Sequence, residues 1–383
     1  MSRHIAVVSV ARSDYGIYRP LLRAITADPA LELSLIVAAT HLTHQFGDTL
    51  SEIIADGFTP AARVDCTLAS DNPASIARSM GLATMNFATA YESLKPDLLV
   101  VLGDRYEMHA AACAAVPMLI PMAHIAGGAI TRGAIDDSLR HSMTKLCHLH
   151  FPETAPQGQR LLDMGEAAWR VHVAGSLALD NVKQVKLLDM ASFNARFGTA
   201  IETPPILVTF HPVTRDAERT ADYAKALMDA LETAPEPILF TYPNADTAGH
   251  VIIDLIEAFI ADHPGHAFAV PHLGTQGYFS AMALAHSMVG NSSSGMTEAA
   301  SFGLPVVNIG RRQEGRLAPP NVINCGHGRD EILAALSKTR IHEFRDTAQG
   351  VVNPYGDGKT APRIVNVLRN VDLSENILMK EMF

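Results

Sequence analysis

The chain has 383 residues, of which 48% are hydrophobic and 18% are charged, which excludes a disordered polyelectrolyte and is typical of a globular protein. At about 100–200 residues per domain, this length predicts two domains. The formal net charge of −10 excludes bulk attraction to nucleic acid. There is no run of about 18 apolar residues, so we predict no membrane span. Four scattered cysteines without a CxxC pair fit a reducing environment, and we expect a cytoplasmic protein.

The first half of the chain alternates short β-branched runs with helical patterns, which is typical of a doubly wound parallel sheet. Helices are predicted near Ile17–Ala27 and Ile76–Leu94. The strands that we predict here are Ile5–Val10, Leu31–Val37, Asp97–Leu102 and Leu119–His124.

A second alternating series begins near residue 205, after a linker that we place near residues 181–186. Its predicted strands are Ile206–Thr209, Ile238–Thr241, Phe268–Val270, Met288–Gly290 and Val306–Asn308. We therefore predict an α/β fold of two Rossmann-like domains, residues 1–180 and 181–365. Residues 366–383 are expected to form a C-terminal helix that crosses back to the first domain.

Ligands of open α/β sheets lie beyond the carboxyl ends of the strands, so the polar residues that come after each predicted strand are the candidates for a site. Both halves of the chain supply such residues, which suggests a cleft between two domains. The candidates are Arg12-Ser13-Asp14, His41, Gly103-Asp104-Arg105, His124, His211, Tyr242-Pro243-Asn244 and Asn291-Ser292-Ser293-Ser294.

The segment GNSSSGMTEAASFG, residues 290–303, carries the strongest local signal. A serine-rich turn between a buried strand and a helix presents backbone N–H groups and hydroxyls to an anion. Glu298, one turn into that helix, could accept hydrogen bonds from ribose hydroxyls. The alternative is a capped helix, with Ser294 as the cap and Glu298 in a capping box.

Two carboxylates, Asp136 and Asp137, follow a flexible stretch that begins at Gly127-Gly128 and contains Gly133. Either could cap a helix and pair with Arg140. That interpretation explains one aspartate, whereas two acids beside an Arg-His pair are typical of acid–base catalysis.

An acid directly after a buried strand is either functional or ion-paired, so Asp104 is a further candidate and Arg105 is its possible partner. His211 follows a predicted strand, where a lone histidine is often only a polar terminus. The 17 histidines do not form a convincing ligand pattern, and we predict no metal. The guanidinium group of arginine can bind phosphate oxygens or form surface ion pairs. The arginines considered for phosphate binding are Arg12, Arg311, Arg312 and Arg316.

Taken together, these motifs resemble the hydrolysing UDP-N-acetylglucosamine 2-epimerases of sialic- and legionaminic-acid biosynthesis. The resemblance extends almost end to end. It is carried by ARSDYGIYRPLL, THLTHQFGDTL, LGDRYE, GAIDDSLRHSMTKL, AGSLALDN, VTFHPVT, PNAD, LGTQGYFSAMALA and GNSSSGMTEAASFGLPVVNIGRRQEGR. It implies the two-domain fold of GT-B glycosyltransferases, a homodimer or homotetramer, a nucleotide-sugar substrate, and neither a metal nor another cofactor.

The resemblance also implies roles for individual residues. The catalytic residues would be the carboxylates Asp104 and Asp136, together with Asp137 and His211. Substrate contacts would come from Arg12 at the diphosphate, Arg105, Ser292 and Ser293 at phosphate oxygens, Glu298 at the ribose, and His211 and Arg312 at the sugar-diphosphate. The implied reaction removes the C2 proton, expels the nucleotide, and adds water to a glycal-like intermediate, so acid–base groups are needed on both ring faces.

One departure concerns acidic side chains that the resemblance places at two positions where this chain has Ala126 and Ala129. The expected activity is release of a nucleoside diphosphate and a 2-inverted, N-acetylmannosamine-type sugar for nonulosonic acid biosynthesis. With the alanines, the substrate could instead be a UDP-2,4-diacetamido-trideoxyhexose, with Asp137 or His124 recruited for proton transfer. A glycosyltransferase and a nucleotide-sugar-binding pseudoenzyme are the other hypotheses.

Overall fold

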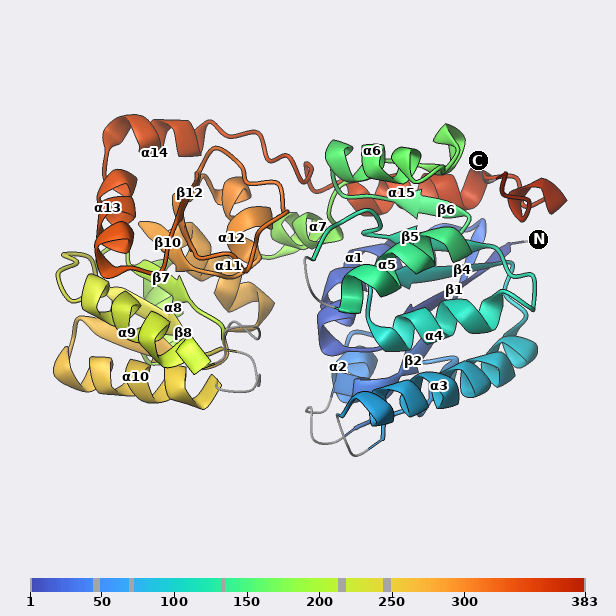
Figure 1. Cartoon of the computed structure of the whole chain (residues 1–383), viewed down its shortest axis with the longest axis horizontal. Helices are drawn as coiled ribbons and strands as arrows, with labels where there is room; N and C mark the ends of the chain where they lie inside the picture. Colours follow the sequence, from blue (N-terminus) through green and yellow to red (C-terminus); the bar gives the residue numbers. More distant parts are fainter. Residues whose placement is uncertain are drawn as a thin grey trace. The chain divides into compact units, whose positions relative to one another are not determined.

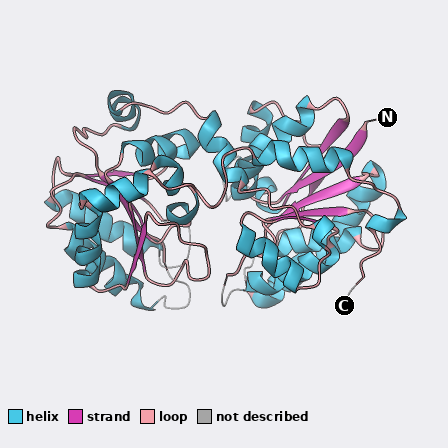
Figure 2. Ribbon diagram, turned by 90° about the horizontal axis from the view of Figure 1, so that it is seen from above, coloured by secondary structure: helices cyan, strands magenta, loops and turns pink. Residues whose placement is uncertain are grey.

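The computed structural model describes residues 2–43, 49–68, 72–131, 135–212, 218–243 and 249–381. The chain divides into two compact units, each with its own sheet and core. Unit 1 is Met1–Asn181 together with Tyr355–Phe383, and unit 2 is Val182–Pro354. In each unit the strands lie between helices, as in a three-layer α/β domain (Figures 1 and 2).

Unit 1 is built on a parallel sheet with the strand order β3-β2-β1-β4-β5-β6. Its strands are β1 (Arg3–Ser9), β2 (Leu31–Ala38), β3 (Ala62–Val64), β4 (Leu98–Leu102), β5 (Met122–Ile125) and β6 (Leu149–Phe151). Its helices are α1 (Arg12–Ala27), η1 (Ala39–Leu42), α2 (Thr49–Ala55), α3 (Pro73–Leu94), α4 (Tyr106–Ala115), α5 (Ile135–Leu146), α6 (Ala155–Asp163), η3 (Ala168–Arg170), α15 (Thr360–Asn370) and η6 (Glu375–Ile377).

Unit 2 repeats this architecture with the strand order β12-β11-β10-β7-β8-β9, again all parallel. Its strands are β7 (Ile206–Thr209), β8 (Ile238–Thr241), β9 (Ala267–Val270), β10 (Ser287–Gly290), β11 (Val306–Ile309) and β12 (Val322–Cys325). Its helices are α8 (Met190–Phe197), α9 (Thr220–Leu231), α10 (Gly249–Asp262), α11 (Gly274–Leu284), α12 (Ser294–Thr297), η5 (Ala299–Phe302), α13 (Arg329–Thr339) and α14 (His342–Gln349). A further helix, α7 (Leu177–Gln184), runs across the division between the units.

The central strands are buried along their whole length because helices cover both faces of each sheet, which explains their continuous apolar sequences. The predicted strands all form, but one begins late: β5 starts at Met122, since Leu119 has a left-handed backbone with φ 55°. Three short edge strands, β3, β6 and β12, are absent from the predicted strands.

The C-terminal segment joins unit 1 at Tyr355, earlier than the predicted residue 366. Hydrogen bonds fix this earlier return. The Ser176 N–H donates to the Tyr355 carbonyl over 2.7 Å, and the Asp180 carboxylate accepts from the N–H groups of Thr360 and Ala361 at 2.9 and 2.7 Å. Residues 355–365 therefore belong to unit 1, which corrects the predicted boundary.

A buried arginine and a partly buried lysine anchor the end of the returning segment. Arg170 donates to the carbonyls of Ile377 and Met379 over 2.8 Å each. Lys380 donates to the Cys147 carbonyl over 2.7 Å and pairs with the buried Glu166 at the same distance. These contacts hold residues 377–380 against the end of α5. Among the described helices, none is long and apolar enough to cross a membrane.

Candidate functional site

The carboxyl edge of unit 1, where its parallel strands end, holds the N-terminal candidates. Arg12 begins α1 just after β1, and Asp104 and Arg105 follow β4. Because β1 and β4 are neighbours in the sheet, their ends lie side by side. Asp136 and Asp137 occupy the first turn of α5, which follows β5, the next strand along.

Asp104 forms an ion pair with Arg140 of α5. The guanidinium is almost entirely buried, with 7% of the side chain exposed, whereas 21% of the Asp104 side chain is exposed. Arg105 is not the partner of Asp104. It donates two hydrogen bonds of 3.2 and 3.1 Å to the buried Glu107. Glu107 is two residues further along the chain, in the first turn of α4.

The two neighbouring aspartates of α5 have different surroundings. Asp137 accepts a 2.7 Å hydrogen bond from the Thr131 N–H and lies 3.3 Å from the Arg140 guanidinium and 3.8 Å from the His141 ring. It therefore fixes the loop before the helix. Asp136 is half-buried and is not tied to that loop by the contacts that hold Asp137. Asp137 therefore ties α5 to Thr131 without capping the helix.

Two further titratable groups are buried at this edge. Burial raises the pKa of Asp14 to about 6, although nearby Arg105 lowers it. Burial lowers the pKa of His124 to about 4, so its ring is neutral at pH 7 and its Nε2 hydrogen-bonds the Gly103 carbonyl over 2.7 Å. His124 thereby holds the turn that carries Asp104.

Arg12 lies at the exposed end of this edge, 3.7 Å from the Glu52 carboxylate of α2. Glu52 also pairs with Arg19, which binds Asp56 at 2.7 Å. The Asp56 carboxylate in turn accepts a 2.6 Å hydrogen bond from Tyr15. This network ties α2 to α1 and leaves more than half of the Arg12 side chain exposed to solvent.

In unit 2, the turn after β10 is organised around Asn291, which is completely buried. Its side chain exchanges hydrogen bonds of 2.7 and 2.8 Å with the backbone of His211, which follows β7. Its carbonyl accepts from Arg312 and Gln313 at 3.0 and 2.8 Å. Only glycine fits before it, because a Cβ on Gly290 would lie 2.0 Å from a backbone oxygen of β7.

The serine turn, residues 291–294, is linked by side-chain hydroxyl groups to a tyrosine of α11. Ser292 and Ser294 hydrogen-bond each other at 2.8 Å, and Ser294 hydrogen-bonds the half-buried Tyr278 at 2.7 Å. The predicted capping box does not form: the N-cap of α12 is Ser293, whose side chain accepts no capping bond, and Glu298 follows the last residue of that helix. Ser292 and Ser293 are half-buried, and the Ser292 hydroxyl accepts a 3.4 Å hydrogen bond from the Ser294 N–H.

His211 is buried beside Arg312, and both effects lower its pKa, to about 4, with burial the larger cause. The imidazole is therefore neutral at pH 7. Arg312 is exposed and donates a hydrogen bond to the turn. Arg311 pairs with Glu314 at 3.0 Å on the surface.

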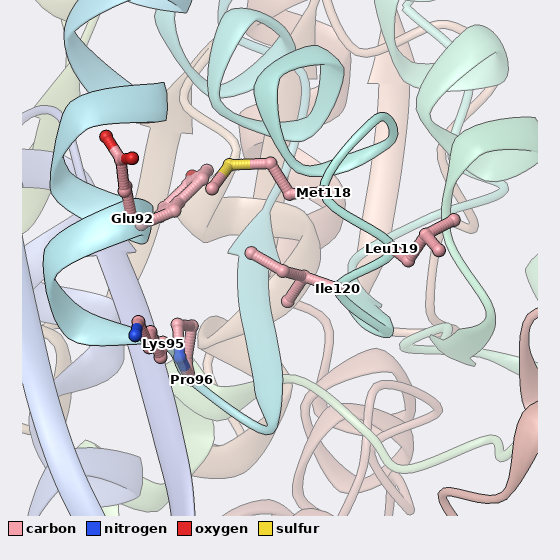
Figure 3. A pocket seen from close by; sticks show the side chains of 7 residues that line it. Glu92, Lys95, Pro96, Met118, Leu119 and Ile120 are labelled. Atoms are coloured by element: carbon pink, nitrogen blue, oxygen red, sulfur yellow. The ribbon is translucent and has the colours of Figure 1, made fainter.

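Two sequence candidates, Asn244 and Gly133, lie outside the described residues. In the part of the chain that the structure describes, no group of three or more His, Cys, Asp or Glu side chains could hold a metal ion. A pocket of about 300 Å³ lies at the opposite edge of the unit 1 sheet, before β4 and β5. Figure 3 shows Glu92 and Lys95 on one side of it and Met118 and Ile120 on the other. None of the candidate residues lines this pocket.

Sequence reasoning missed the residues that hold the site together. Arg140 was considered only as a partner for its own helix, although its ion pair reaches Asp104, 36 positions away. Asn291 was recognised as a polar strand end, but its role as a buried anchor depends on neighbouring strands. Tyr278 lies 16 positions before its partner Ser294, and no local pattern could have identified it.

Both carboxyl edges thus carry the groups that the sequence motifs suggested, and comparison with known proteins gives their family. Residues 23–369 match the family model of UDP-N-acetylglucosamine 2-epimerase. The chain belongs to this family. It is an enzyme closely related to the hydrolysing 2-epimerases.

Two relatives of this family member match along almost the whole chain. The GDP/UDP-N,N'-diacetylbacillosamine 2-epimerase (hydrolyzing) of Campylobacter jejuni is 37% identical over 99% of this chain and 98% of its own. The UDP-N,N'-diacetylbacillosamine 2-epimerase (hydrolyzing) of Legionella pneumophila is 36% identical over 99% of both chains.

Among solved structures, the UDP-GlcNAc 2-epimerase of Neisseria meningitidis bound to UDP-GlcNAc has the same fold. Its TM-score is 0.82 at 19% identity, covering 95% of this chain and 99% of that one. The similarity confirms the predicted α/β fold of two domains of the GT-B type.

Proposed function

We propose that the protein is a hydrolysing 2-epimerase of a nucleotide-activated 2,4-diacetamido-trideoxyhexose, and that it supplies the 2-inverted sugar to nonulosonic acid biosynthesis. The observation that carries this proposal is the similarity to the two diacetylbacillosamine enzymes, 37% and 36% identical. The UDP-N-acetylglucosamine 2-epimerase of Neisseria meningitidis is 29% identical over 96% of the chain. The difference favours the sugar with the additional acetamido group.

The two alanines agree with this choice of substrate. Ala126 and Ala129 lie in the segment between β5 and α5, close along the chain to the candidate catalytic helix. Methyl side chains at these positions occupy less volume than the acidic side chains expected from the resemblance. We infer that the space accommodates a bulkier sugar, with Asp104 and Asp136 carrying the proton transfers.

Unit 2 is proposed to bind the nucleoside diphosphate. The serine turn offers hydroxyl and backbone N–H donors, which suit phosphate oxygens, and Glu298 offers a carboxylate to ribose hydroxyls. Arg312 adds a cation on the same side of the sheet. Neutral His211, held beside Arg312 by Asn291, is proposed to contact the sugar-diphosphate.

Unit 1 is proposed to supply the acid–base groups, while Arg12 and Arg105 contact the substrate. A carboxylate removes the C2 proton, and the C–H electron pair forms the C1–C2 double bond as the C1–O bond breaks. The nucleoside diphosphate leaves with the electron pair of that bond. Water then adds its hydroxyl to C1 of the glycal, and a proton returns to C2 from the opposite face.

One assay tests the activity and its alternatives. The protein is incubated without an acceptor, with the UDP- or GDP-linked diacetamido sugar or with UDP-N-acetylglucosamine, and released nucleotide and sugar configuration are measured. We expect nucleoside diphosphate together with a 2-inverted sugar, and a higher kcat/KM for one of the diacetamido substrates. Binding without release would indicate a pseudoenzyme. Release of nucleotide only after an acceptor sugar is added in a parallel incubation would indicate a glycosyltransferase.

The same assay sharpens the role of the alanines. In the Ala129→Glu variant, the larger acidic side chain should lower kcat/KM for the diacetamido substrate more than for UDP-N-acetylglucosamine. An equal decrease in kcat/KM for both substrates would show that Ala129 does not determine substrate specificity. The homodimeric or homotetrameric state stays a prediction, which light scattering would test.

A further inference from the structure

Arg140 joins three segments of unit 1 through one buried guanidinium. It forms the ion pair with Asp104 at the end of β4 and approaches Asp137 of its own helix at 3.3 Å. It also donates 3.0 Å hydrogen bonds to the Thr131 hydroxyl and to the Ala129 carbonyl. The loop that contains Ala129 is therefore held to the helix through its backbone and one hydroxyl.

A buried charge of this kind needs compensation from partners with good geometry. The charge of Arg140 is compensated by two carboxylates and two neutral oxygens. Both carboxylates remain partly accessible to solvent, with 21% of the Asp104 side chain and 24% of the Asp137 side chain exposed. The cation is thus hidden from a ligand, while the carboxylate beside it can reach one. Such an arrangement stabilises the ionised form of an accessible acid.

We propose that Arg140 is a positioning residue that keeps Asp104 ionised and oriented, so that Asp104 acts as a proton acceptor in the reaction. The inference rests on the proposed function. In the step concerned, the Asp104 carboxylate takes the C2 proton, the C–H electron pair becomes the C1–C2 double bond, and the nucleoside diphosphate leaves from C1. Arg140 touches neither the sugar nor the nucleotide in this step.

Other charged and titratable groups of the neighbouring elements also bear on Asp104. Arg105 is already paired with Glu107, and neutral His124 holds the adjacent Gly103 carbonyl. The remaining groups around this cluster are Asp14 on α1, Asp136, Asp137 and His141 on α5, and Arg160 on α6, which donates to the Gly128 carbonyl. Among the described residues, Arg140 forms the ion pair with Asp104.

The test compares Arg140→Gln, Arg140→Lys and a control, Arg170→Lys. Arg170 is also buried in unit 1, but it binds carbonyls of the C-terminal segment. For each variant, kcat/KM is measured as a function of pH, and nucleoside-diphosphate affinity is measured by calorimetry. Thermal unfolding identifies variants that do not fold.

In Arg140→Gln the acidic limb of the kcat/KM profile should move to higher pH, and kcat should fall by about 10²-fold, as expected when a proton acceptor is impaired. Arg140→Lys keeps the positive charge but lacks the bidentate guanidinium group. The acidic limb of its kcat/KM profile should therefore stay at the wild-type pH, while kcat falls in part. Nucleotide affinity should change less than twofold in both. In Arg170→Lys we expect lower thermal stability with an unmoved acidic limb.

If Arg140→Gln does not fold, Arg140→Lys carries the test, and normal kcat in it would overturn the proposal. A folded Arg140→Gln with the wild-type limb would overturn it as well. Both results presuppose an active wild type. A wild-type protein that turns over none of the sugar nucleotides would instead overturn the proposed function, and with it the role of Asp104.

Discussion

At the carboxyl edge of unit 1, charged side chains meet in ion pairs, such as Asp104 with Arg140 and Arg105 with Glu107. At the same edge of unit 2, amide and hydroxyl groups bind each other: Asn291 holds the backbone of His211, and Ser294 bonds Tyr278. The sheets are otherwise alike, each with six parallel strands. The comparison shows that one architecture presents either ion-paired side chains or hydrogen-bonded amides and hydroxyls, depending on the residues at the carboxyl ends of its strands.

The sharpest way to break this comparison is to neutralise the acids of unit 1. Asp104→Asn and Asp136→Asn should each lower turnover by about 10²–10⁴-fold, because a proton-transfer group is lost. Affinity for free nucleotide should stay nearly unchanged. Steady-state kinetics and calorimetry measure the two effects.

The two variants should differ in their free energy of unfolding, because the two aspartates have different surroundings. Asp104→Asn leaves the buried Arg140 without a full counter-charge and should lower the free energy of unfolding. Asp136→Asn removes no ion pair among the contacts described and should change it by less than about 0.5 kcal/mol, as is usual at the protein surface. Near-normal turnover in both variants would make these acids structural.

A second prediction uses the buried acid of unit 1 and pH. Because burial raises the pKa of Asp14 from 3.8 to about 6, the protonated carboxyl favours the folded state. This stabilisation is complete below pH 3.8 and is lost as the pH rises through 6, at a cost of about 3 kcal/mol above that range. Asp14→Asn, which stays neutral, should therefore be more stable than the wild type at pH 8 and similar to it near pH 4. Urea unfolding at both pH values measures this, and equal stability at pH 8 would contradict it.

In unit 2, the matching change removes neutral hydroxyls. If the serine turn binds phosphate as proposed, the double variant Ser292→Ala, Ser293→Ala should lose two charge-assisted hydrogen bonds, each worth about 1.5–3 kcal/mol. Nucleoside-diphosphate affinity should fall at least about tenfold. Ser301→Ala, a serine in the following η5, serves as the control. Unchanged calorimetric affinity in the double variant would remove the serine turn from the nucleotide site.

The smallest expected effect concerns the exposed pair of Arg12 and Glu52. Glu52 pairs with Arg12 and with Arg19. Because such pairs contribute about 0–1 kcal/mol each, Glu52→Gln should lower the free energy of unfolding by at most about 2 kcal/mol. Freed from one partner, Arg12 should bind a diphosphate equally well or slightly better. A large loss of nucleotide affinity would show that Glu52 orients Arg12 rather than competes for it.

The sequence predicted the sheets well because central strands such as β4 are continuous apolar runs bounded by turns. It failed at β3, whose three residues, one of them arginine, carry no pattern. At the candidate site it identified the polar strand ends but paired Asp104 with its neighbour Arg105. The true partner, Arg140, is brought there by α5, and only the tertiary fold determines which helix turn faces which strand.

The return of the chain to unit 1 at Tyr355 makes unit 2 an insertion within unit 1. On the ribosome, residues 182–354 can therefore complete their own sheet while unit 1 still lacks α15 and the Lys380 anchor. Domains fold as units during synthesis, and usually the N-terminal one folds first. In this chain the order of completion is the reverse. Unit 1 begins to emerge first, but its fold is completed last, when residues 377–380 pack against Glu166 and the end of α5.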